Sequence, residues 1–198
     1  MCKIQAIAKP RKILLLHLWY CFFFLWTVGT VFADLSKNTP WSILDTKYTK
    51  IHYHSWKDLT KFNSNIDYSP SSMGLKWLFK KKSPNDIENE IKLKVDAVYE
   101  KVQEILDMRK SMEKLTIYIS HDKQELHSLY EKIFKTPCHL RAWYVYELNA
   151  VYINVDDIHE GIIAHEIAHS IIDHYLLIRP PKATAEILAR YVDSHLFD

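Results

Sequence analysis

A pattern with the spacing of a metal site lies near the end of the sequence, where His165, Glu166 and His169 form His-Glu-x-x-His. On an α-helix, residues four apart are rotated by about 40° and displaced by one turn, so both imidazoles can reach one metal ion. Glu166 is rotated by about 100° from His165 and lies near the ligands without being required as one. From there it can take a proton from a water that a zinc ion has acidified to a pKa near 7. The pattern therefore predicts a zinc site with a general base beside it.

The neighbours of this pattern indicate a helix inside a domain. They are apolar almost all round, and comprise Ile162, Ile163, Ile167, Ala168, Ile171 and Ile172. A strand expected before the helix and a candidate third ligand after it favour a functional motif over a chance match.

A catalytic zinc usually has three protein ligands and one open position, so a third ligand is needed. His174 lies five residues after His169, and a continuous helix turns it away from the metal face. Pro180 and Pro181 end the first helix and allow a turn. A second helix then begins near residues 182–184 and presents Glu186 in its first turns. We therefore predict that His165, His169 and Glu186 bind Zn²⁺.

This arrangement resembles the gluzincin metallopeptidases, which are thermolysin-like and bind zinc through His, His and Glu. The resemblance rests on His-Glu-x-x-His followed by Glu186-x-x-Ala189 on a second helix, and on Asp173 four residues after the second histidine. The small size and the run 185–191 resemble the compact peptidase MA-like or minigluzincin group. The metzincin pattern does not fit, because Tyr175 stands where its third histidine is required. The chain departs from MA-like members in lacking Trp and Gly around the glutamate.

The resemblance implies further roles in the site. Glu166 is expected to be the general base and later the proton donor. An oxyanion donor is also expected. Tyr191 is the first candidate for this donor, and the alternative is that it packs against the core. His195 is a weaker candidate, and the alternative is that it lies on the surface. Asp173 or Asp193 is a candidate for orienting a ligand imidazole, and a solvated position on a helix face is the alternative for both.

Residues 1–33 have the pattern of an export signal. Four basic residues and no acidic residue come before an apolar run from Ile13 to Phe32. Val31-Phe32-Ala33, at the end of this run, resembles a signal-peptidase site. If uncleaved, the run is long enough to anchor the chain in a membrane. In either case the domain, residues 34–198, is predicted to be extracytoplasmic.

Composition favours one folded domain over disorder, with 198 residues of which 48% are hydrophobic. The net charge is +2, but removing the four basic residues of the N-terminal segment leaves 22 basic and 24 acidic residues, so no nucleic-acid partner is expected. Of the three cysteines, only Cys138 lies after residue 33, and one cysteine forms no internal disulfide. It is expected to be a buried free thiol, with ligation of the zinc as the alternative.

The remaining pattern predicts an α+β fold. Its elements are a strand at 50–54, one helical turn at 59–62, a long helix from 84 to about 112, a strand at 115–120, a helix at 121–134 and two strands, 141–147 and 150–155, joined by Leu148-Asn149. We expect a small twisted mixed sheet packed on the zinc helix, with the glutamate-bearing helix and a long backing helix, as in a zincin-like domain. His52 and His54 share one face of their strand. They either form part of a second metal site or are solvated. By the resemblance, one edge of the 142–155 hairpin would hold a peptide by strand addition, unless that edge is covered.

Three functions remain open from the sequence. The leading hypothesis is an exported zinc metallopeptidase that hydrolyses peptide or protein substrates. The first alternative is a noncatalytic exported binding module with a structural zinc, which Cys138 or His139 as a fourth ligand would support. The second is a membrane-anchored interaction domain in which the motif is accidental.

Overall fold

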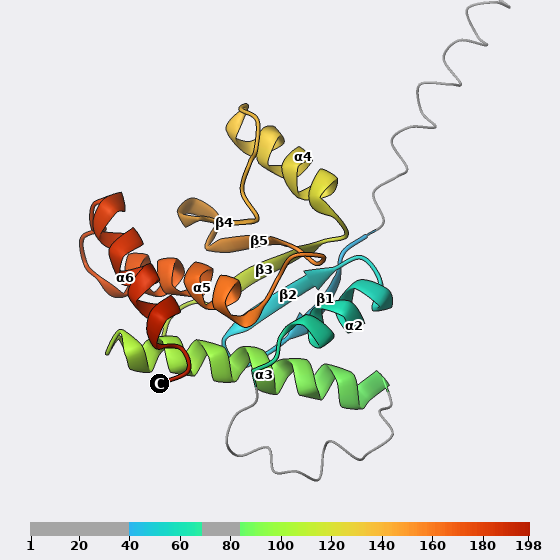
Figure 1. Cartoon of the computed structure of the whole chain (residues 1–198), viewed down its shortest axis with the longest axis horizontal. Helices are drawn as coiled ribbons and strands as arrows, with labels where there is room; N and C mark the ends of the chain where they lie inside the picture. Colours follow the sequence, from blue (N-terminus) through green and yellow to red (C-terminus); the bar gives the residue numbers. More distant parts are fainter. Residues whose placement is uncertain (1–39, 69–83) are drawn as a thin grey trace, which may run out of the picture. The chain divides into compact units, whose positions relative to one another are not determined.

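The computed structural model describes residues 40–68 and 84–198, in which five strands and five α-helices form an α+β fold (Figure 1). Residues 41–198 make one compact unit. The expected signal or anchor segment, residues 1–33, lies outside the described residues. In the described part, no helix has the length and apolar character needed to cross a membrane. The elements are β1 (Ser42–Asp45), β2 (Thr49–Tyr53), α2 (Trp56–Asn65), α3 (Pro84–Ile105), β3 (Leu115–Ser120), α4 (Lys123–Phe134), β4 (Ala142–Val145), the 3-10 turn η2 (Tyr146–Leu148), β5 (Ala150–Asn154), α5 (Glu160–Tyr175) and α6 (Lys182–His195).

The predicted mixed sheet is confirmed, and its strand order is β1-β2-β3-β5-β4. The three central strands are parallel, and each outer strand is antiparallel to its neighbour. β4 pairs with β5 alone and therefore forms one edge of the sheet. The expected hairpin is present with shorter strands, because η2 and Asn149, at φ 42°, make the turn.

The two faces of the sheet are covered by different helices. Along β5, Val151 and Ile153 face the large core that includes α2, α3 and α5, while Tyr152 faces a smaller cluster with Leu126 of α4. This alternation is the two-residue period of a strand. Figure 1 shows α4 on one side of the sheet and α3 and α5 on the other.

The helix that carries both histidines is deeply buried, as its apolar sequence predicted. Ile163, Ile167 and Ile171 of α5 have no exposed surface. They lie in the large core together with residues of α3, α6 and the sheet. The buried face of α5 fixes which way its remaining residues point, and these include the two histidines.

One strand was not predicted, and two helices differ in length from their predictions. β1 was not predicted, because only Leu44 of its four residues is buried. The expected single turn at 59–62 is the ten-residue helix α2, which Ser55 caps by accepting a hydrogen bond from the backbone N–H of Asp58. α3 ends at Ile105 rather than near Met112.

The early end of α3 has a local cause. Asp107 adopts a left-handed conformation with φ 52°. Its N–H bonds to the carbonyl of Glu104, and the N–H of Met108 bonds to that of Gln103. This is a Schellman motif, which satisfies the last carbonyls of the helix and turns the chain away.

Candidate metal centre

Two consecutive helices carry the three predicted ligands. His165 and His169 lie one turn apart on α5, and Glu186 lies on α6. Six residues join the helices, and the backbone N–H groups of Thr184 and Ala185 both bond to the carbonyl of Pro181. α6 therefore begins directly after the prolines, and it packs along α5 so that Glu186 comes to the two histidines.

The ligand atoms have the separation that one metal ion requires. Nε2 of His165 lies 3.2 Å from Nε2 of His169, and the two oxygens of Glu186 each lie 3.7 Å from one of these nitrogens. All three ligand atoms lie within 4.8 Å of one another. Tetrahedral zinc with bonds of about 2.1 Å holds its ligand atoms roughly 3.4 Å apart. The residues thus fit a zinc ion in both chemistry and spacing.

Asp193 is the hydrogen-bond partner of the first histidine. Its Oδ2 lies 3.1 Å from Nδ1 of His165, two helical turns after Glu186 on α6. This hydrogen bond is the main reason that the pKa of His165 is raised. A proton on Nδ1 leaves Nε2 with a lone pair directed to the other two ligands. Burial, followed by the charge of His165, lowers the pKa of His169, which favours its neutral, ligating form.

Asp173, the other candidate for orienting a histidine, has a different partner. Its side chain is 3% exposed, and its Oδ2 accepts a hydrogen bond of 2.8 Å from Nε of Arg179. It is therefore neither solvated nor hydrogen-bonded to a ligand histidine.

Glu166 is buried beside the cluster. Only 8% of its surface is exposed, and this burial raises its pKa to about 7. The charge of His165 opposes that rise, whereas Glu186 and Asp193 add to it. A carboxyl group in this environment suits proton transfer near neutral pH.

Two cavities meet the cluster. Both are bordered by His165 and Glu166. The first, of about 670 Å³, extends toward Arg141 and His159. The second, of about 620 Å³, also borders His169 and Glu186 and extends along β4 to the α5–α6 connection. The candidate base and ligands are thus accessible from outside.

Tyr191 does not join the cluster. It is 48% exposed, its ring stacks on His195 at 3.9 Å between centroids, and neither residue borders these two cavities. Five residues of helix rotate Tyr191 by about 140° from Glu186, which accounts for its position.

Tyr144 is a site residue that the sequence analysis missed. It lies on β4, borders the second cavity, and its ring is parallel to that of His169 with centroids 6.4 Å apart. Its hydroxyl is buried and has no hydrogen-bond partner among the described residues. Burial raises its pKa above the usual range, so the hydroxyl stays a donor. The alternation along 142–145 places Tyr144 on one face of its strand, but only the packing of β4 against α5 brings that face to the cluster.

The other metal-ligand candidates lie elsewhere. Cys138 is a buried free thiol. In the described part of the chain, His165, His169 and Glu186 are the one group of three or more His, Cys, Asp or Glu residues close enough to hold an ion. Cys138 and His139 therefore supply no fourth ligand, and His52 and His54 belong to no second group of this kind.

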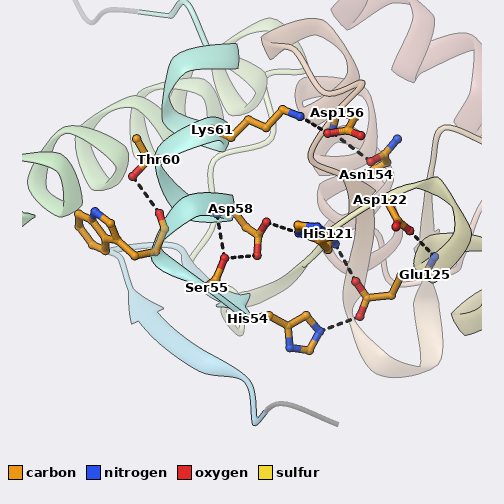
Figure 2. A network of polar contacts seen from close by, with 11 residues as sticks. His54, Ser55, Asp58, Thr60, Lys61, His121, Asp122, Glu125, Asn154 and Asp156 are labelled. Atoms are coloured by element: carbon orange, nitrogen blue, oxygen red, sulfur yellow. Dashed lines mark hydrogen bonds and ion pairs between the residues drawn. The ribbon is translucent and has the colours of Figure 1, made fainter. Parts of the chain in front are cut away.

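His54 instead belongs to a polar network at the carboxyl ends of the parallel strands (Figure 2). Its Nε2 lies 2.7 Å from Oε1 of Glu125, near the start of α4. Nδ1 of His121 lies 2.6 Å from Oδ1 of the buried Asp58, and Ser55 donates a 2.6 Å hydrogen bond to the other oxygen of Asp58. These contacts tie α2 and α4 to the ends of β2 and β3.

Comparisons with known proteins identify no relative: no family model matches the chain, and neither a curated protein nor a solved structure matches it.

Proposed function

We propose that this protein is an exported zinc metallopeptidase of zincin-like fold and gluzincin type. The observation that carries the proposal is the convergence of His165, His169 and Glu186 on one point, with the buried carboxyl of Glu166 beside it at the meeting of two cavities. A structural zinc is normally enclosed by four ligands and needs no base. Three ligands on an accessible wall favour catalysis over the binding-module alternative.

In the proposed reaction, His165, His169 and Glu186 would hold a zinc ion, which would supply a Lewis acid able to lower the pKa of a water molecule and to polarise the carbonyl of the peptide bond. Glu166 accepts the proton from the attacking water and then delivers it to the nitrogen of the leaving amine. Asp193 keeps the proton of His165 on Nδ1 throughout. The hydroxyl of Tyr144 donates a hydrogen bond to the developing oxyanion, a role for which it is better placed than Tyr191.

The proposed substrate is an extended peptide. β4 is an edge strand and borders the second cavity, so its outer backbone groups are suited to pairing with a substrate strand. Export follows from the pattern of residues 1–33, and membrane contact would arise through that segment if it is retained. The proposal includes no nucleic-acid partner.

A Glu166→Gln substitution tests the proposal. We expect the purified full chain and the variant to bind one zinc each, and only the parent to hydrolyse a denatured protein substrate. Gln keeps the shape of the side chain but accepts no proton, so we expect a loss of at least about 10²-fold in kcat. Glu147→Gln is the matched control, because Glu147 is exposed and borders neither cavity. Zinc binding without hydrolysis by the parent would favour the noncatalytic binding module.

A further inference from the structure

Two cationic side chains line the second cavity beyond the metal ligands. Arg179 lies in the α5–α6 connection, and Lys182 is the first residue of α6. Within the described residues, no ion pair or hydrogen bond engages the ammonium group of Lys182. The cavity that contains the proposed reaction site therefore has a positively charged end.

Arg179 is held in place by its neighbours. Its Nε donates to Asp173 at 2.8 Å, and its guanidinium lies 4.4 Å from the centre of the Tyr146 ring. The side chain is still 51% exposed, and its Nη groups donate to no described residue. A guanidinium fixed at one edge and stacked on a ring presents its other edge in the fork geometry that matches a carboxylate.

The charges at this end of the cavity are not balanced. Asp173 offsets one of the two cations. Glu186 also borders the cavity one turn after Lys182 on α6, but its oxygens lie at the two histidines, so the ammonium group of Lys182 remains for a ligand to neutralise. The second oxygen of Asp173 is buried and accepts no hydrogen bond from the described residues. This oxygen is closed to a ligand, so the exposed groups at this end are the two cations, which are complementary to a carboxylate.

The position of Asp173 sets the distance from the reaction site. It lies four residues after His169 on α5, or about 6 Å along the helix. An extended peptide advances about 3.3 Å per residue. A group bound at Arg179 is therefore about one or two residues from the peptide bond at the cluster.

We propose that Arg179 and Lys182 bind a carboxylate of the peptide, one or two residues from the bond that is cut. This inference rests on the proposed function, because it names the substrate class of the same site. The carboxylate is either the C-terminus of the substrate or the side chain of an acidic residue.

Two pairs of peptides distinguish these sources. The first pair is acetyl-Ala-Ala-Phe-Ala as the free acid and as the amide. The second pair is acetyl-Ala-Ala-Phe-Glu-Ala amide and its Gln counterpart. Binding is measured by calorimetry on the zinc-loaded full chain with Glu166→Gln, so that no hydrolysis is needed for the readout. We expect the carboxylate member of at least one pair to bind about tenfold more tightly than its neutral partner.

Substitution of the cations then tests the assignment. We expect Lys182→Gln to reduce the preference for the carboxylate peptide, and Arg179→Gln to remove it. Lys182→Gln breaks no described contact, so it remains informative if loss of the Arg179–Asp173 pair unfolds the protein. Arg190→Gln is the control, because Arg190 is exposed on α6 and borders neither cavity.

Equal binding within both pairs, or absence of binding by all four peptides, would overturn the inference. A preference that survives Lys182→Gln unchanged would do the same for the role of Lys182. Hydrolysis by the parent without a carboxylate preference leaves the proposed function standing. A carboxylate preference without hydrolysis by the parent leaves the binding site standing and contradicts the peptidase.

Discussion

At the scale of residues, the candidate metal centre brings together three side chains of α5 and α6 whose ligand atoms lie within 4.8 Å of one another, and Tyr144 of β4 borders the same cavity. His165, His169 and Glu186 were predictable because helical spacing alone brings two of them together, and the paired prolines place the third on the next helix. Tyr144 was not predictable in the same way. Its position depends on β4 lying beside α5, and that contact joins segments that no local periodicity relates. Tyr191 was chosen for its place on α6, but the helical rotation takes it away from Glu186.

A pair of tyrosine substitutions separates these two assignments. We expect Tyr144→Phe to lower kcat by about 10²-fold or more while zinc content is unchanged, because it removes one hydrogen bond to the oxyanion. Tyr191→Phe is expected to leave kcat unchanged, since its exposed hydroxyl borders neither cavity. The measurement is steady-state hydrolysis by the three proteins at equal zinc occupancy. A larger loss from Tyr191→Phe would return the donor role to that residue.

At the scale of elements, long apolar patterns were predicted well and short half-buried ones were not. α5 is apolar on nearly every side, so its burial followed directly from its sequence. α2 presents few large apolar residues to the core, and its stability depends on the Ser55 cap and on packing against α3 and the sheet. Its polar sequence contains no comparable signal. The polar network in Figure 2 also stabilises α2, because it links this helix to the turn before α4.

The link between His121 and Asp58 predicts a pH dependence of stability. The hydrogen bond that His121 donates to Asp58, together with the charge of Asp58, raises the pKa of His121. Burial and Lys57 oppose the rise, and Asp122 adds to it. A raised pKa in the folded state means that the contribution is fully present below the unfolded value of about 6.5 and is lost as the pH rises through the folded value. We therefore expect the parent to lose stability relative to His121→Gln as the pH is raised from about 6 to 8.

Urea unfolding of both proteins across that range checks this prediction. The effect is expected to be small, because the His121 side chain is 56% exposed and solvent screens the pair. A difference between parent and variant that stays constant with pH would mean that the pair does not contribute through ionisation.

At the scale of the whole molecule, α5, α6 and one face of the sheet share one continuous core, and the candidate site lies beside the edge strand β4. The fold class was predictable from the order of helical and strand patterns. The strand order was not, because the pairing of β2 with β3 joins segments on either side of α3. The same is true of the cavity wall, to which α4 contributes Tyr130 and Phe134 from the far face of the sheet.

The proposed metal centre is tested most directly by the zinc content of the purified full chain and of Glu186→Gln, measured by elemental mass spectrometry after dialysis against a series of buffered zinc concentrations. We expect one zinc per parent chain. We expect Glu186→Gln to weaken zinc binding by more than the roughly 100-fold that loss of a residue hydrogen-bonded to a ligand costs, because a direct ligand is removed. Glu147→Gln is expected to bind zinc as the parent does. A parent chain that retains no zinc, or a Glu186→Gln variant that binds zinc as tightly as the parent, would contradict the proposed metal centre.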